Sequence, residues 1–506
     1  MSPEHLVVVG NGMAAVRLVE ALVAGGWLRR GGALTVLGEE QGAPYNRILL
    51  SAVLEGTHEE RATTLRDERW YADAGVALRT GVRVVAVDRE AREVELASRE
   101  RVAYDRLVLA TGSIPTLPPV RGLVRPDGSL HPRVHAFRSM TDCRGLTDAL
   151  ADAQEGGRTP VRRAVVVGGG LLGLQVARAL GARRGQHAVV TEVVEGADHV
   201  LHRQLDRPGA QVLTRDLARL GTTVYTGARA TRLVASPAPD HAVGVRLDNG
   251  HVLATDLVVL TAGGRPSTAL ARAAGLEVRR GVVVDDTLTT ADPRVHAIGD
   301  CAQHAGRVSG FVGPAWDQAT TLAARLLGEE RAYAGVREVA RLRATGLDVA
   351  VLGDPTDPQG GDVVEMTNPI ARSHRRLVVR EGRIVAAALV GDLSRVGLVT
   401  QLFDRGTVLG PHEAGDLLLP ETRSGASGPA DLPDDAEVCA CAGVSAGALR
   451  ACSSLEQARA TTRATTGCGG CAPAVRALLA TDPPAAAGPA AAPTDHPVPA
   501  PTGGTR

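Results

Sequence analysis

Four cysteines near the end of the printed sequence are the residues best placed to do chemistry. Cys439 and Cys441 form a C-x-C pair, and Cys468 and Cys471 form a C-x-x-C pair after 26 intervening residues. Four thiolates can hold a [2Fe–2S] cluster or a structural zinc ion, because each close pair lets one turn present two sulfur atoms. Another cysteine, Cys452, lies between the pairs without a partner at ligand spacing. We expect it to be a buried helix residue.

A glycine-rich loop near the start of the chain predicts a nucleotide site. Gly10, Gly12 and Ala15 fit the pattern G-x-G-x-x-A between an apolar run and a helical pattern. Gly10 permits a tight turn, Gly12 lets the backbone approach a pyrophosphate, and Ala15 keeps the helix close to the sheet. Glu39, 24 residues further on, could accept hydrogen bonds from ribose hydroxyls. The alternative for Glu39 is a solvated loop acid.

The same pattern returns in the middle of the chain. Gly168, Gly170 and Gly173 follow a second apolar run and open a second helical pattern. The candidate ribose acid is Glu195, with Glu192 as its competitor three residues earlier. Because a carboxylate repels a 2′-phosphate, this loop favours NADH over NADPH. The alternative for Glu195 is an exposed charge at the end of a strand.

Short apolar runs around both loops predict buried parallel strands. We therefore expect an α/β fold with two Rossmann-like dinucleotide-binding domains, the second inserted in the first. Apart from those that precede the loops, the runs span residues 34–37, 106–110, 188–194, 257–260 and 295–298.

Composition narrows the class of protein. The 506 residues are 44% hydrophobic, and 56 basic residues balance 56 acidic ones, so nothing favours a nucleic-acid partner. The chain lacks an apolar run of about 18 residues and an export signal, so we expect a cytoplasmic protein without membrane contact. Seven cysteines, four of them clustered, favour metal ligation over disulfides in such a chain.

Further motifs resemble those of flavoprotein reductases with two dinucleotide domains. Thr111 and Gly112 lie in an A-T-G segment, which passes the flavin in that family, and residues 263–266 match its G-x-R-P turn. Gly299 and Asp300 match the G-D motif, whose aspartate binds the ribityl chain of FAD. The resemblance implies a glutathione-reductase-like fold with FAD in the first domain and NAD(P)H in the second.

A finer resemblance points to nitrogen assimilation. Residues 44–51, which include Arg47, look like a segment of the NAD(P)H nitrite reductase large subunit and of the assimilatory nitrate reductase electron-transfer subunit. It implies that Arg47 binds the FAD pyrophosphate; a surface arginine is the alternative. Residues 313–319 place Trp316 near the flavin or in the core. Gln175 stands where the family has a glutamate that touches nicotinamide or flavin, so Gln175 and Trp316 are the catalytic candidates.

The cysteine segment resembles the bacterioferritin-associated-ferredoxin module, which implies a [2Fe–2S] cluster rather than zinc. No dithiol motif occurs in the flavin half, where Cys143 and Cys301 stand alone and are expected to be small buried hydrophobes. We expect an FAD-binding domain, an NAD(P)H-binding domain, a small α+β domain, a linker, a small helical [2Fe–2S] module and a disordered tail. Their bounds are, in that order, 1–118 with 245–325, 119–244, 326–419, 420–433, 434–480 and 481–506.

The cofactors together predict an electron path from NADH through FAD and the cluster to a partner. A sirohaem domain needs four more cysteines, and only 35 residues follow Cys471. We therefore expect a separate terminal reductase, a molybdenum nitrate reductase first and a sirohaem nitrite reductase second. The alternatives are a ferredoxin-reductase-like enzyme for another redox partner, a redox-responsive binding module, and a zinc protein with vestigial nucleotide loops.

Overall fold

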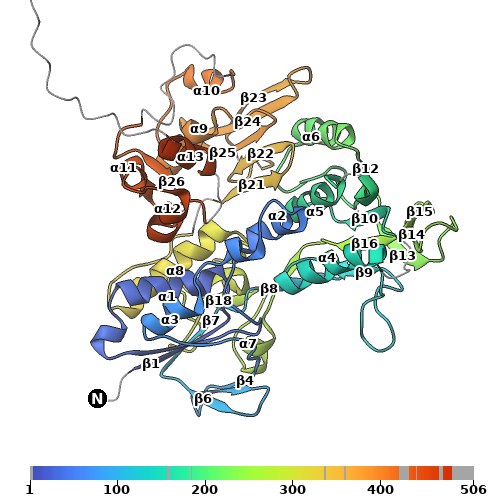
Figure 1. The fold of residues 1–506 in the computed structure, drawn as a ribbon. Coiled ribbons are helices and arrows are strands. Elements are labelled where there is room, and N and C mark those ends of the chain that lie inside the picture. Colours follow the sequence, from blue (N-terminus) through green and yellow to red (C-terminus); the bar gives the residue numbers. More distant parts are fainter. Residues whose placement is uncertain are drawn as a thin grey trace, which may run out of the picture. The chain divides into compact units, whose positions relative to one another are not determined.

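The computed structural model forms two compact units, residues 1–423 and 424–506 (Figure 1). None of the helices that it describes combines the length and the hydropathy that crossing a lipid bilayer requires. The structure describes residues 4–155, 160–183, 185–335, 338–357, 360–420, 432–439, 442–466 and 471–480.

A five-stranded parallel sheet forms the first domain of the larger unit. The middle strands of this sheet are mainly apolar and buried, as parallel strands usually are, whereas the short strand at residues 77–79 is partly exposed. Helix α1 (Met13–Ala24) packs against α8 (Val312–Leu326), which comes from the far end of the domain sequence (Figure 1). In spatial order the strands are β19 (Val295–Ala297), β7 (Arg106–Leu109), β1 (His5–Val9), β2 (Ala33–Leu37) and β3 (Ala77–Arg79).

A second five-stranded parallel sheet forms the inserted domain. The predicted boundary at residue 244 lies too early, because the strand at 257–260 pairs with the strand that precedes the second glycine-rich loop. The helices of this domain are α4 (Met140–Glu155), α5 (Leu171–Gly181) and α6 (Arg207–Arg219). In spatial order its strands are β12 (Thr222–Thr226), β11 (Val190–Glu195), β10 (Arg163–Val167), β16 (Leu257–Leu260) and β9 (Val134–Ala136).

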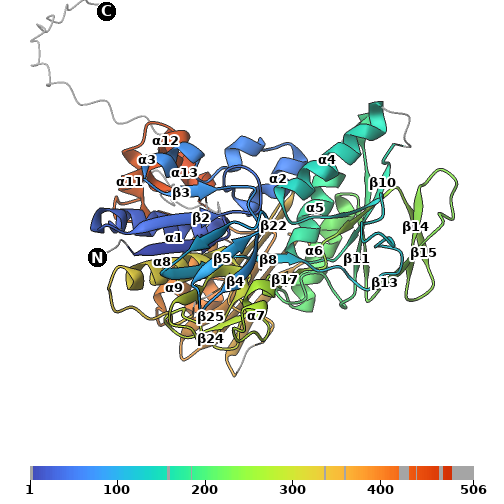
Figure 2. The same ribbon diagram turned by 90° about the horizontal axis from the view of Figure 1, so that it is seen from below.

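The chain passes between the two domains through an antiparallel ribbon of β8 (Ser113–Pro115) and β17 (Gly264–Pro266), visible in Figure 2. The outgoing and returning segments are therefore paired with each other. Each domain also carries a three-stranded meander. The first has a small parallel pair and two short helices, and a third short helix, α2 (Leu50–Glu55), packs against α4 and α5 of the inserted domain. The meanders, the pair and the other two short helices are β4 (Val84–Asp88), β5 (Glu93–Leu96), β6 (Arg101–Ala103), β13 (Ala230–Val234), β14 (Val243–Leu247), β15 (Val252–Thr255), β18 (Val282–Val284), β20 (Ala302–His304), α3 (Glu68–Asp73) and α7 (Ala269–Ala273).

An antiparallel sheet with two helices completes the larger unit, as the expected small α+β domain. Its apolar side chains share one hydrophobic core with α5 and α6 of the inserted domain, and Figure 1 shows β21 beside α5. The helices are α9 (Val396–Arg405) and α10 (Glu413–Asp416). In spatial order the strands are β21 (Val339–Ala344), β22 (Leu347–Leu352), β25 (Arg383–Val390), β24 (Ser373–Arg380) and β23 (Asp362–Asn368).

The smaller unit holds the cysteine module. Ser445 and Ser454 cap two of its helices by accepting backbone N–H groups, which fixes where those helices begin. Its core joins Cys439 and Cys471 to apolar residues of all three helices. Most of the predicted linker and the whole predicted tail lie outside the described residues. The elements are β26 (Glu437–Cys439), β27 (Val444–Ser445), α11 (Ala446–Arg450), α12 (Leu455–Thr462) and α13 (Ala472–Ala480).

Candidate functional site

The first glycine-rich loop leaves the end of β1 and enters α1. Gly10 has a φ of +114°, and a β-carbon there would lie 2.2 Å from the carbonyl oxygen of Ala110, so only glycine fits. Gly12 is the N-cap of α1, and a β-carbon on it would meet nothing within 4 Å. Ala15 is buried against the sheet. The loop therefore has open space in front of a helix N-terminus, which suits a pyrophosphate.

The second glycine-rich loop repeats this geometry between β10 and α5. Gly168 has a φ of +117°, and its β-carbon would lie 2.6 Å from the carbonyl oxygen of Thr261. A β-carbon on Gly173 would lie 1.8 Å from the carbonyl oxygen of Gly168, so this glycine lets the helix approach the strand end. Gly170, the N-cap of α5, faces open space as Gly12 does. Both loops therefore fit a dinucleotide phosphate.

The structure separates the two candidate acids of the second domain. Glu195 accepts hydrogen bonds from the backbone N–H of Gly169 at 2.6 Å and of Ala197 at 2.8 Å. Glu192 accepts instead from the hydroxyl of Tyr225 at 2.9 Å. Glu195 is therefore the acid at the glycine-rich loop, where a ribose acid belongs.

An arginine that sequence reasoning missed lies next to this acid. A β-carbon on Gly196 would lie 3.2 Å from Cγ of Arg229, which follows β12. Only the fold brings this cation to the end of β11, more than thirty positions away along the chain. No linear motif could have located it.

The candidate acid of the first domain is solvated. The side chain of Glu39 is 71% exposed, and its nearest ion-pair partner is Arg83 at 3.6 Å. Its position just beyond β2 leaves the carboxylate accessible. The geometry is therefore that of the loop-acid alternative, and the exposed carboxylate remains accessible to a ribose.

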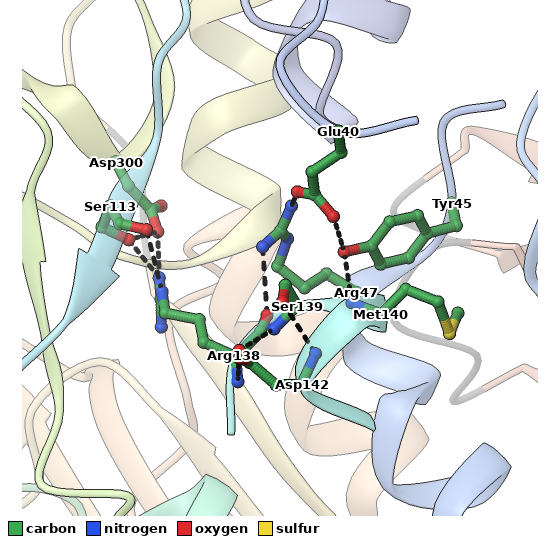
Figure 3. A network of polar contacts seen from close by, with 9 residues as sticks. All are labelled: Glu40, Tyr45, Arg47, Ser113, Arg138, Ser139, Met140, Asp142 and Asp300. Atoms are coloured by element: carbon green, nitrogen blue, oxygen red, sulfur yellow. Dashed lines mark hydrogen bonds and ion pairs between the residues drawn. The ribbon is translucent and has the colours of Figure 1, made fainter. Parts of the chain in front are cut away.

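The neighbouring acid, Glu40, turns inward and organises a network between the two domains (Figure 3). Glu40 forms an ion pair with Arg47 and accepts a hydrogen bond from the Tyr45 hydroxyl at 2.7 Å. Burial raises the pKa of Tyr45, so the phenol remains neutral and donates. Arg47 also donates to the carbonyl oxygen of Arg138 at 3.0 Å. Arg47 is therefore a fixed, half-buried cation rather than a surface arginine.

The flavin-motif aspartate lies at the other end of this network. Asp300 forms an ion pair with Arg138 at 2.8 Å and accepts a hydrogen bond from the Ser113 hydroxyl at 2.7 Å (Figure 3). Both contacts use Oδ2 of Asp300. Arg138 belongs to the connection between β9 and α4 of the other domain, so sequence reasoning did not place it here.

The other flavin-motif residues shape the backbone around the first loop. Thr111 donates to the carbonyl oxygen of Ser267 at 2.7 Å, and Gly112 has a φ of +65°. The N–H of Gly299 donates to the side-chain oxygen of Gln318 at 2.7 Å, and Gly299 has a φ of +76°. Two strands of the first sheet thus lead into glycine turns, and a β-carbon on Gly299 would lie 3.1 Å from Cβ of Ala14 in α1.

The two catalytic candidates are both buried. Trp316 is 4% exposed, and its indole N–H donates to the carbonyl oxygen of Met13 at 3.2 Å, where α8 packs against α1. Trp316 is therefore packed in the core, which was the alternative to a place near the flavin. Gln175 is buried on α5 in the second domain. The catalytic roles of both residues remain predictions.

The cysteines fall into two environments. Cys439 and Cys471 are buried in the same hydrophobic cluster, and Cys471 Sγ accepts the backbone N–H of Thr465 at 3.2 Å. An N–H aimed at a sulfur atom suits a thiolate ligand of a cluster. Cys441 and Cys468, the other two predicted ligands, lie outside the described residues.

The remaining cysteines are not at ligand spacing. Cys143 and Cys301 are buried, as expected, and burial raises the pKa of Cys143 to about 11. The prediction for Cys452 is wrong, because it is half-buried and lies between α11 and α12 rather than inside a helix. Its Sγ donates to the carbonyl oxygen of Ala448 in α11.

Comparison with known proteins identifies both units. Residues 4–320 match the family described as pyridine nucleotide-disulphide oxidoreductase. The chain belongs to this family. Residues 437–481 match the BFD-like [2Fe-2S] binding domain. This pyridine nucleotide-disulphide oxidoreductase is therefore an NAD(P)H-dependent flavoprotein enzyme with FAD and a [2Fe–2S] cluster, and the predicted cofactors and fold class are confirmed.

Relatives of this oxidoreductase extend the resemblance over most of the chain. It is 33% identical over 95% of its length to a nitrite reductase [NAD(P)H] of Bacillus subtilis, of which it covers 58%. It is 30% identical over 95% to the assimilatory nitrate reductase electron transfer subunit of the same organism, of which it covers 60%. The chain thus spans less than two thirds of both relatives. Among solved structures, a Rhodopseudomonas palustris ferredoxin reductase for the CYP199A2 system has a TM-score of 0.71 and 27% identity, covering 82% of this chain and 98% of that one.

Proposed function

We propose that this oxidoreductase takes electrons from NADH and delivers them to a separate terminal reductase of nitrate or nitrite assimilation. One observation carries the proposal: two dinucleotide loops and a [2Fe-2S] domain occur in the same chain, and 95% of that chain aligns with relatives named for nitrite and nitrate reduction. The first choice of partner is a molybdenum nitrate reductase, and a sirohaem nitrite reductase is the second.

The order of cofactors follows from their chemistry. FAD accepts a two-electron hydride and releases electrons singly, which lets a nicotinamide supply a [2Fe–2S] cluster that takes one electron at a time. The protein holds and tunes these groups. Gly12 with the N-terminus of α1 would face the FAD pyrophosphate with Arg47, and Asp300 would bind the ribityl hydroxyls.

The preference for NADH rests on Glu195. Its carboxylate is bonded to the backbone of the second glycine-rich loop. There it would accept hydrogen bonds from the ribose hydroxyls and repel a 2′-phosphate. Arg229 supplies an opposing charge at the same place and would partly offset that repulsion. The preference is therefore for NADH with measurable use of NADPH.

The cluster ligands in this proposal are Cys439, Cys441, Cys468 and Cys471. The burial of the two described cysteines in one cluster and the N–H donor on Cys471 support it. Exclusion of water around the sulfur atoms is one of the means by which a protein sets the potential of a cluster.

The decisive experiment uses anaerobically purified full-length protein. Addition of NADH should bleach the flavin absorbance and produce the electron paramagnetic resonance signal of a reduced [2Fe–2S] cluster. Purified molybdenum nitrate reductase or sirohaem nitrite reductase, added in parallel, should then turn over nitrate or nitrite at the expense of NADH. If neither terminal enzyme turned over while the cluster was reduced, the assimilatory role would be wrong.

A second candidate function has its own support. The ferredoxin reductase structure is covered over 98% of its length, so the flavin unit has the architecture of an enzyme named for reducing a separate ferredoxin. In that case the chain would pass electrons to a soluble carrier directly from the flavin. The Cys468→Ser variant separates the two functions. It should lose terminal reductase turnover and keep NADH-driven ferricyanide reduction under the first proposal, and keep ferredoxin reduction under the second.

A further inference from the structure

The turn that follows α12 has an unusual backbone for its sequence. Arg463 has a φ of +65° and Thr465 has a φ of +67°, although neither residue is glycine. A left-handed conformation is especially unfavourable for a β-branched residue such as threonine, and it persists only where the surroundings enforce it. Ala464, between them, is fully buried. The module therefore holds this turn in place against its local preference.

The strained turn delivers a hydrogen bond to a predicted cluster ligand. The backbone N–H of Thr465 donates to Sγ of Cys471 at 3.2 Å, and both residues are buried. A reduced cluster carries more negative charge on its sulfur atoms than an oxidised one. A fixed N–H donor therefore stabilises the reduced form and raises the reduction potential, more so where water is excluded.

Side chains around the turn fix the direction of that N–H. Nε of Arg459, on the last turns of α12, donates to the hydroxyl oxygen of Thr465 at 3.0 Å. The Thr462 hydroxyl accepts the backbone N–H of Ala464 at 3.2 Å. Arg459 thus connects a regular helix to Thr465, whose backbone N–H donates to the sulfur of Cys471.

We propose that Arg459 is a positioning residue that, through the Thr465 hydroxyl, holds the Thr465 N–H on Cys471 and raises the potential of the [2Fe–2S] cluster. The proposal rests on Cys471 being a ligand, as given above. Its consequence is a larger driving force for electron transfer from the flavin to the cluster, one electron at a time. Without Arg459 the turn can relax toward negative φ values. This moves the Thr465 N–H away from Sγ of Cys471 and leaves every cluster ligand in place.

The test is a redox titration of the full-length holoprotein, with the cluster followed by electron paramagnetic resonance. Arg459→Ala and Thr465→Val should both shift the cluster midpoint to more negative potential. Valine keeps the branching of threonine but cannot accept the hydrogen bond from Arg459. Thr465→Ser keeps the hydroxyl and should stay near the wild-type potential. The flavin midpoint should be unchanged in every variant.

A matched arginine controls for a general loss of stability. Arg450 belongs to the same module, where its guanidinium bonds the carbonyl oxygen of Leu432 and pairs with Asp434. Arg450→Ala should leave the cluster potential unchanged. Equal potentials for Arg459→Ala and wild type, or equal shifts for Arg459→Ala and Arg450→Ala, would overturn the proposal. If Arg459→Ala failed to hold a cluster, the test would be the difference in cluster midpoint potential between Thr465→Val and Thr465→Ser. Equal potentials for these two variants would also overturn the proposal.

One further variant separates this inference from the ligand assignment. Cys471→Ser should remove the cluster signal and lower the iron content. A complete cluster in Cys471→Ser would show that the ligand assignment itself is wrong. A cluster lost in Cys471→Ser but unshifted in Arg459→Ala would leave the ligand in place and reject only the positioning role.

Discussion

The two glycine-rich loops have nearly the same backbone but different acids. Gly10 and Gly168 have φ values of +114° and +117°, and each approaches the carbonyl oxygen at the end of the neighbouring strand. Glu195 is bonded to the second loop and its side chain is 11% exposed, whereas the side chain of Glu39 is 71% exposed. The strand–loop–helix unit therefore forms the phosphate site in the same way in both domains. The position of the acid that would bind the ribose differs between them.

The difference follows from what each domain has to hold. The first domain has additional charged groups, Arg47 and Asp300, and Asp300 pairs with Arg138 of the inserted domain. Such a set of fixed charges suits a cofactor that stays bound. The second domain instead holds its acid, Glu195, on the backbone of the loop, which suits a cofactor that enters and leaves. An acid that is already held in position can select between nucleotides without an ordering cost when the nucleotide binds.

The strongest test of the comparison inserts a methyl group into each loop. Gly173→Ala places a β-carbon 1.8 Å from a carbonyl oxygen, and Gly10→Ala places one 2.2 Å from another. Gly173→Ala should lower NADH-driven flavin reduction roughly a hundredfold, about 2.8 kcal/mol, with FAD retained. Gly10→Ala should instead yield protein purified largely without FAD. Stopped-flow absorbance and flavin content measure the two effects.

Gly145→Ala is the matched control for both loop variants. Gly145 lies in α4, and a β-carbon there meets nothing within 4 Å. Alanine also favours a helix by about 1 kcal/mol over glycine, so this variant should keep full activity with equal or higher stability. Loss of FAD from Gly173→Ala and Gly10→Ala alike would show that the two domains do not act separately.

The next largest effect concerns the acid of the second loop. Glu195→Gln removes the charge that accepts two backbone N–H groups, and it should raise the KM for NADH about tenfold. Because repulsion of a 2′-phosphate also disappears, the KM for NADPH should fall. Glu192→Gln is the control, since that side chain faces Tyr225, and steady-state kinetics with both nucleotides should leave it close to wild type. A larger effect for Glu192→Gln would move the ribose contact to that residue.

A smaller effect is expected from the network between the domains. Arg138→Ala leaves Asp300 without its ion-pair partner and should weaken FAD binding about fivefold, or ~1 kcal/mol. Flavin fluorescence during dialysis against FAD-free buffer measures this change. Arg144 lies in α4, shortly after Arg138 in the chain, and pairs with Glu60, so Arg144→Ala should bind FAD normally. Equal FAD loss from both variants would attribute the effect to domain stability.

The sequence predicts best what depends on the backbone alone. The glycines of both loops and the strands before them are where their spacing indicates, because only glycine tolerates those φ values and close approaches. The end of the inserted domain was misplaced, since an apolar run such as 257–260 fits either parallel sheet equally well. Pairing between strands far apart in sequence leaves no local signal.

Partners that lie far apart along the chain were also invisible in the sequence. Arg138 reaches Asp300, and Arg229 reaches Gly196, from segments that carry no motif. Cys452 was expected to be a buried helix residue because it has no partner at ligand spacing, but it lies just before Ser454, the N-cap of the next helix. Side-chain roles of this kind depend on the tertiary fold rather than on spacing.

The smallest effect is the one that most directly sharpens the contrast between the acids. Glu39→Gln should change FAD retention by less than about twofold. An exposed carboxylate must lose hydrogen bonds to water when it binds a ribose, so its net contribution to the binding free energy is small. Arg83, its neighbour at 3.6 Å, is also exposed, so the lost ion pair adds little. Flavin release rates measure this change beside those of Arg138→Ala. If Glu39→Gln released FAD faster than Arg138→Ala, the first domain would depend on its ribose acid as the second does. The difference in exposure between Glu39 and Glu195 would then have no effect on cofactor binding.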